Sequence, residues 1–128
     1  MDTKVIQVRK NVTIASRLIN ASSFTYTIDN VPFVPDEVIV KNVIYNPDGA
    51  DVVTYQIYSD VVNDVIAICM QDVIVRPEMH FTLKTRVNQT WKFSVWNYNK
   101  ELTNITAGEI FIQLEFVKYS QAKEQKLN

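Results

Sequence analysis

Ile110-Phe-Ile-Gln-Leu-Glu-Phe-Val-Lys118 decides the fold, because apolar and polar side chains alternate along most of this stretch. Successive side chains of a β-strand point to opposite faces of its sheet. Gln113 and Glu115 therefore fall on an outward face. The opposite face, which we expect to line a core, holds Ile110, Ile112, Leu114 and Phe116. A polar tail, 119–128, follows directly, so we predict that the last strand of a sheet ends here.

Similar segments recur along the rest of the chain, bounded by Asn, Asp, Pro or Ser residues that favour turns. Val, Ile and Thr, which favour strands, are abundant, whereas Ala and Leu, which favour helices, are scarce. The chain is therefore predicted to be all-β. After a short N-terminal stretch, 4–8, the segments expected to form strands are 12–19, 24–29, 37–45, 52–58, 65–70, 79–86, 91–96 and 110–118.

Eight strands in a chain of 128 residues fit a single domain, 1–128. A jelly roll, in which two four-stranded sheets enclose one core, needs about this many strands and residues. We therefore predict an eight-stranded jelly-roll β-sandwich, with an immunoglobulin-like sandwich as the alternative. The polar ends, 1–10 and 120–128, are expected to be flexible arms that neighbouring molecules could order.

Strict alternation divides the apolar residues of the segment 37–45 between two faces. One face holds Val38, Val40 and Ile44. The other face holds Ile39, Val43 and Tyr45. A strand of this kind is covered on both sides. It is either a central strand of the core or a strand whose outer face a neighbouring subunit covers.

The charge of the chain is nearly balanced, with 13 basic residues, 14 acidic residues and a formal net charge of -1. No basic patch is evident, so direct binding to nucleic acid is not expected. No apolar run is long enough to span a membrane and no secretion signal is visible, so we expect synthesis in the cytoplasm without secretion. The single cysteine, Cys69, lies in an apolar run and is expected in the core without a disulfide.

The sequence lacks the motifs that catalysis usually needs. His80 is the only histidine, no Gly-x-Ser-x-Gly motif is present, and His80 is expected to face solvent from the middle of a strand. One histidine cannot build the metal site of a cupin, and the two isolated glycines cannot form a phosphate-binding loop. We therefore predict no catalytic residue, metal or cofactor. Carboxylates are numerous and are interpreted as solvated loop acids, although spacing alone leaves open a glycosidase acid pair among Asp60, Asp64 and Asp72.

The aromatic residues near the end of the segment 91–96 are the best candidates for contacts. Alternation places Trp91, Phe93 and Val95 on one face and Trp96 on the other. Trp96 then either covers a second packed face or serves, with nearby Tyr98, as an exposed anchor for a protein or a sugar ring. The complete set of candidate interface or ligand contacts is Trp96, Tyr98, Lys100 and Tyr119.

Two parts of the chain carry a family resemblance. One is Phe24-Thr-Tyr-Thr-Ile-Asp-Asn-Val-Pro-Phe-Val-Pro-Asp-Glu-Val-Ile-Val-Lys-Asn-Val-Ile-Tyr45, a strand, a proline-bounded loop and a longer strand, and the other is the last strand up to Tyr119. They resemble the small single jelly-roll proteins of tailless icosahedral double-stranded DNA viruses with double-jelly-roll capsids, including virophages. Those proteins form pentameric vertices or related minor capsid positions.

This resemblance implies a non-enzymatic virion protein that forms a homopentamer and contacts the major capsid protein. A ring of subunits uses two different patches on each subunit, which agrees with a sandwich that is apolar on more than one face. The chain has no large inserted domain, so a host-attachment role is not expected. Two alternatives from other classes remain: a carbohydrate-binding, lectin-like module that uses Trp96 and Tyr98, and a trimeric subunit of a phage baseplate or fibre.

Overall fold

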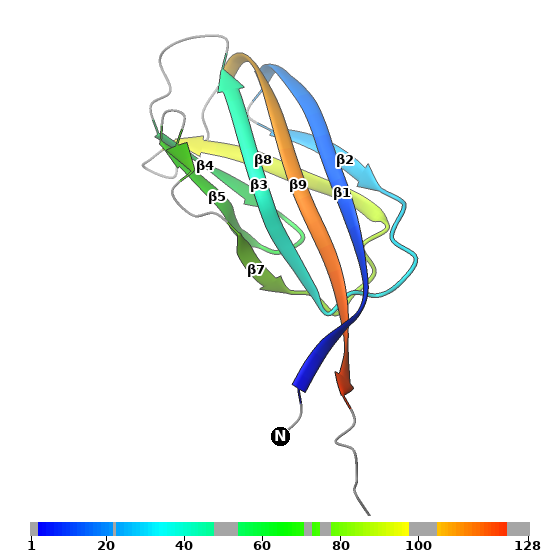
Figure 1. Ribbon diagram of the computed structural model, residues 1–128. Coiled ribbons are helices and arrows are strands. Elements are labelled where there is room, and N and C mark those ends of the chain that lie inside the picture. Colours follow the sequence, from blue (N-terminus) through cyan, green and yellow to red (C-terminus); the bar gives the residue numbers. More distant parts are fainter. Residues whose placement is uncertain are drawn as a thin grey trace, which may run out of the picture.

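The computed structural model describes residues 3–21, 23–47, 54–70, 73–74, 78–97 and 105–122 (Figure 1). Within these ranges the chain forms strands and no helix, which confirms the all-β prediction. The strands are β1 (Thr3–Ala21), β2 (Ser23–Ile28), β3 (Glu37–Pro47), β4 (Thr54–Ser59), β5 (Asp64–Met70), β6 (Val73–Ile74), β7 (Met79–Thr82), β8 (Gln89–Asn97) and β9 (Ile105–Ala122).

The strands form two antiparallel sheets that pack face to face as a β-sandwich. Sheet A has the order β1-β9-β3-β7, and sheet B has the order β2-β8-β4-β5-β6. Figure 1 shows β1, β9 and β3 of sheet A in front of β2, β8 and β4 of sheet B. The first described strand therefore pairs with the last one, and strands that follow each other in the sequence often lie in different sheets.

The core lies between the sheets and follows the predicted alternation. On β9, the four residues predicted to face inward are at most 2% exposed, namely Ile110, Ile112, Leu114 and Phe116. On β8, Trp91, Phe93 and Val95 are buried, and the Trp91 ring meets the Phe116 ring edge to face at 5.7 Å between centroids. Glu115, predicted to point outward, is nevertheless 8% exposed. It lies on a central strand, between Asn11 on β1 and Ile39 on β3, whose side chains crowd it.

The predicted faces of β3 were wrong beyond Val40. The register of β3 against β9 shifts between Val40 and Asn42, so Lys41 is an extra residue in a β-bulge. A one-residue insertion reverses the faces of all later side chains. Val43 and Tyr45 therefore join Val38 and Val40 in the core, whereas Ile39 and Ile44 lie on the outer face of sheet A.

The ends of the chain are also arranged differently from the expected arms. The segments 4–8 and 12–19 belong to one strand, β1, whose register against β9 shifts between Ile6 and Val8. Residues 3–10 are paired with β9 along this strand, and residues 120–122 belong to β9. In Figure 1 the ends of β1 and β9 extend together beyond the body of the sandwich. The remaining parts of the predicted arms, 1–2 and 123–128, lie outside the described residues.

Two strand lengths differ from the sequence pattern. β7 ends at Thr82, although alternation continues to residue 86. β9 begins at Ile105, although the sequence pattern predicted a strand only from residue 110. Pairing with the long strands β1 and β3 explains this extension, because partners supply hydrogen bonds that local sequence does not reveal.

Candidate functional site

Of the four predicted contact residues, only Tyr119 has a side chain that the structure describes. Trp96 is on β8 of sheet B, where it pairs in register with Gln56, and Tyr119 is on β9 of sheet A. Tyr98 and Lys100 lie outside the described residues, as does the side chain of Trp96. The carbohydrate-binding alternative, which depends on Trp96 and Tyr98, remains an untested prediction.

Tyr119 lies in a cluster of polar side chains on the outer side of sheet A. Its hydroxyl donates a hydrogen bond to Glu37 Oε1 at 3.2 Å, and His80 Nδ1 lies 2.6 Å from the same oxygen. Lys4 Nζ lies 5.7 Å from the centre of the Tyr119 ring, within the range of a cation–π interaction. The cluster thus joins four strands, because these residues come from β1, β3, β7 and β9.

Asp36 anchors the loop 29–36 beside this cluster. Its backbone N–H donates to the carbonyl of Val117, and its own carbonyl accepts from the N–H of Leu83, each at 2.9 Å. Its carboxylate Oδ2 accepts the backbone N–H of Tyr119, also at 2.9 Å. One residue therefore connects the loop before β3 to β9 and to the segment after β7.

Burial raises the pKa of Tyr119 above its ordinary value of 10.0, and the carboxylate of Glu37 raises it further. Glu115 and Asp36 add smaller effects in the same direction. The phenol is therefore protonated at neutral pH, as its hydrogen bond to Glu37 requires. In this position it acts as a donor that holds β9 to β3.

A depression of about 400 Å³ opens over this cluster. It is lined by Lys4, Asp36, Glu37, Thr82, Lys84, Tyr119 and Ser120. Two lysines face two carboxylates, so the lining has no excess of either charge. Because Asp36 and Glu37 are already bonded to other parts of the chain, the arrangement chiefly braces the end of β9.

His80 faces solvent, as predicted, with a half-exposed side chain, while Met79 and Phe81 on either side pack against the core. The sequence did not reveal its contact with Glu37. The sequence does place a histidine in one predicted strand and a carboxylate, Glu37, in another. Alternation does not show which strands are neighbours, so it could not predict this contact. In the described part of the chain, no group of three or more His, Cys, Asp or Glu residues could hold a metal ion.

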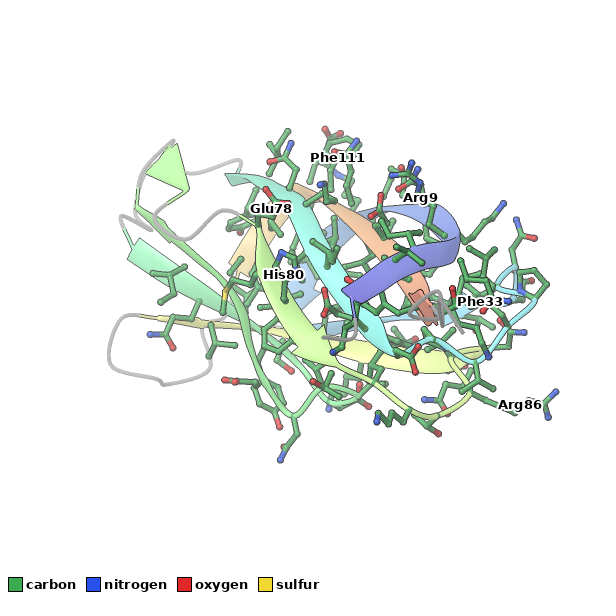
Figure 2. The ribbon with its side chains drawn as sticks, turned by 60° about the horizontal axis from the view of Figure 1, so that its bottom comes forward. Arg9, Phe33, Glu78, His80, Arg86 and Phe111 are labelled. Atoms are coloured by element: carbon green, nitrogen blue, oxygen red, sulfur yellow. The ribbon has the colours of Figure 1, made fainter. Side chains whose placement is uncertain are left out.

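A second feature is an apolar row across the outer face of sheet A. Phe111 on β9 pairs in register with Ala15 on β1 and with Ile44 on β3. Ile44 is 43% exposed and Phe111 is 37% exposed. Figure 2 shows Phe111 pointing away from the sandwich. We call Ala15, Phe111 and Ile44 the outer apolar row.

Polar residues border the outer apolar row on both sides. One border contains the ion pair between Arg17 and Glu109, whose atoms Nη1 and Oε1 are 3.3 Å apart. The other border is an uncharged register row of Thr13, Gln113 and Asn42. An apolar strip with a polar rim is the usual anatomy of a protein–protein contact.

Exposed large apolar side chains are concentrated on sheet A. Five of the six in the described part of the chain lie on its strands, namely Val5, Ile6, Ile19, Ile44 and Phe111, and the sixth is Val34 in a loop. Single exposed apolar residues are common, and consecutive residues such as Val5 and Ile6 point to opposite faces, so only Ile44 and Phe111, which pair in register, are a candidate contact.

Comparisons of the chain with protein-family models, with curated proteins and with solved structures find no match. Among the residues that the structure describes, no helix is long and apolar enough to cross a membrane.

Proposed function

We propose that this protein is a non-enzymatic structural subunit of a virion, which contacts neighbouring subunits through the outer face of sheet A. The observation that carries the proposal is the outer apolar row, in which Phe111 and Ile44 are exposed side by side on strands of a folded sandwich. Burying such residues between subunits contributes about 25 cal/mol for each Å² of apolar surface removed from water.

The strand order supports a finer assignment to the jelly-roll fold. When the two-residue strand β6 is set aside, each sheet has four strands, in the orders β1-β9-β3-β7 and β2-β8-β4-β5. A jelly roll arranges eight successive strands in this order. This agreement adds to the resemblance to the vertex and minor capsid proteins of tailless icosahedral DNA viruses.

In this proposal the protein is a vertex, or penton, protein that assembles as a homopentamer and contacts the major capsid protein. A five-membered ring needs a head-to-tail contact, in which two different surfaces of each subunit meet. The outer face of sheet A supplies one of them, and the major capsid protein binds elsewhere on the ring. The virion is then the place where the protein acts.

Native mass spectrometry of the purified chain, over a range of protein and salt concentrations, tests this proposal. We expect a discrete pentamer whose proportion rises with protein concentration. Salt should not dissociate it, because apolar burial is not screened as exposed charges are. A monomer at every concentration, or an open series of oligomers, would contradict a closed ring.

Matched variants test whether the outer apolar row makes the contact. Ile44→Asp should abolish the pentamer, because it places a charge in the apolar part of the interface. Val34→Asp is the control, because Val34 is equally exposed, at 43%, but lies in a loop away from this row. Equal loss of assembly in both variants would argue against this face as the contact.

A further inference from the structure

The edge of β1 is a second surface, distinct from the outer apolar row. β1 has 19 residues and pairs with β9 on one side. On its other side, the described part of the chain offers no backbone partner. An open strand edge presents N–H and C=O groups that can pair with an added strand. The register with β9 is continuous from Val8 to Ile19, so this part of the edge is regular enough to act as a template.

All the charged side chains of β1 are cationic. The strand contains Lys4, Arg9, Lys10 and Arg17 but no Asp or Glu. Arg17 is paired with Glu109, and Lys4 lies over the Tyr119 ring. Arg9 and Lys10 have no acidic partner within the described residues, and Figure 2 shows Arg9 projecting from the strand. The regular part of the edge thus begins with two consecutive cations, on opposite faces of the sheet, in a chain whose net charge is -1.

The positive charge of β1 makes some strands better binding partners than others. A second copy of β1 is unsuitable, because a pair of such strands would bring together eight cations and no acid, and like charges on neighbouring strands repel. An acidic strand would instead place carboxylates beside Arg9 and Lys10 while its backbone bonds to the edge. Cationic side chains on an edge strand also oppose its pairing with other strands. A strand with acidic side chains would remove this repulsion.

We propose that the Val8–Ile19 edge of β1 binds an extended, acidic segment of another protein by β-strand addition. The backbone of the added segment supplies the hydrogen bonds, and its carboxylates opposite Arg9 and Lys10 supply the selectivity. This goes beyond the proposed structural role, because it concerns a different surface, and a monomer could bind such a segment as well as a pentamer could.

The test uses a fluorescent synthetic peptide with an adjacent Glu-Glu pair inside a run of Val and Thr, because Arg9 and Lys10 point to opposite faces of the sheet. Binding is followed by fluorescence anisotropy. Amide NMR shifts locate the site, and we expect them to change along β1. Two control peptides separate the contribution of charge from that of the backbone hydrogen bonds. One replaces every Glu by Lys and should not bind. The other is methylated on alternate backbone nitrogens, which removes donors without changing charge, and should bind at least about tenfold more weakly.

Protein variants provide the second arm. Arg9→Glu combined with Lys10→Glu should weaken binding by about tenfold or more, because attraction is replaced by repulsion. Arg86→Glu combined with Lys92→Glu is the matched control, since it changes the net charge equally at exposed positions outside β1. This control should change the dissociation constant by less than about twofold. Circular dichroism confirms that both variants are folded.

Several results would overturn the inference. Equal binding of the methylated peptide would mean that no strand is added, and equal weakening by the control variant would mean that binding is not at β1. Tighter binding of a duplex oligonucleotide, weakened by the same Arg9 and Lys10 changes, would identify phosphate as the ligand instead. None of these results depends on whether the chain forms a pentamer.

Discussion

Asp36 illustrates how one side chain organises the end of the molecule from which β1 and β9 extend. Its carboxylate accepts the N–H of Tyr119, which is part-buried, while its backbone bonds to Val117 and Leu83. Substitution by Ala keeps the backbone bonds but removes the carboxylate bond. A part-buried N–H that loses its acceptor raises the free energy of the folded state.

Replacing Asp36 by Ala should therefore lower the free energy of unfolding by about 1–3 kcal/mol, measured by urea denaturation. Asp36→Asn should cost less, because the amide oxygen can still accept the bond. Asp29→Ala, at an exposed position of the same loop, is the control and should have an effect within about 0.5 kcal/mol. Equal losses for Asp36→Ala and Asp36→Asn would show that the bond to Tyr119 is unimportant.

Tyr119 gives the protein a specific sensitivity to alkaline pH. Burial, followed by the charge of Glu37, raises its pKa in the folded state above 10.0. Above pH 10.0 the unfolded chain loses this proton more readily than the folded chain does. The folded state then binds more protons, so stability must fall as the pH rises through this region.

We expect Tyr119→Phe to remove this contribution. Unfolding free energies measured from pH 8 to pH 11.5 should fall more steeply in the natural protein than in the variant. The difference at pH 8 gives the cost of losing the bond to Glu37, because Tyr119 is protonated there in both states. Parallel curves across the whole range would contradict a raised pKa.

At the scale of the elements, the bulge at Lys41 determines which side chains β3 contributes to the core. The residues before it and after it face inward together only because one residue is inserted between Val40 and Asn42. The bulge also places Ile44 on the outer face, where Ile39 lies in any case. Without the bulge, the core would lose Val43 and Tyr45, and the outer apolar row would lose Ile44.

Deletion of Lys41 tests this view of β3. A shortened strand must either expose Val43 and Tyr45 or break its pairing with β9, so we expect a loss of about 3 kcal/mol or more in urea denaturation. Lys41→Ala is the matched control. It removes only an exposed ion pair with Glu78 and should cost less than about 1 kcal/mol. A deletion that is as stable as Lys41→Ala would show that the register can slip without penalty.

At the scale of the whole molecule, the two ends of the described chain lie side by side. Thr3 pairs with Ala122 in the register of β1 and β9. This pairing brings together residues from opposite ends of the sequence, so the sandwich closes only when nearly the whole chain is present. Folds dominated by such distant pairings fold slowly, in milliseconds to seconds.

Because Thr3 lies beside Ala122, a circular permutant in which the natural ends are joined should fold. Joining Asn128 to Met1 uses 123–128 and 1–2 as the linker, and new ends can be opened between Thr85 and Arg86, which are exposed in the segment between β7 and β8. We expect cooperative unfolding by urea and a far-ultraviolet spectrum like that of the natural chain. Opening the chain between Leu114 and Glu115, inside β9, is the control and should prevent folding.

Alternation along the sequence predicted the positions of some residues of the candidate surfaces but not of others. Alternation was enough to place Phe111 and Gln113 on the outer face, because β9 has no bulge along this part. It could not place Ile44 beside Phe111, since that contact depends on the bulge at Lys41. Nor could it show that His80 reaches Glu37, because strand neighbours are chosen by the packing of both sheets.

The sequence by itself determined the all-β class, most strands, and the inward faces of β8 and β9, because the two-residue period of a strand is a local property of the chain. The tertiary structure decided which strands pair, where the register shifts, and how the chain ends are held. These features depend on hydrogen bonds and packing between distant residues, such as Asp36 with Tyr119 and Ala15 with Phe111. No local pattern encodes them, so only the folded molecule reveals the outer apolar row and the open edge of β1.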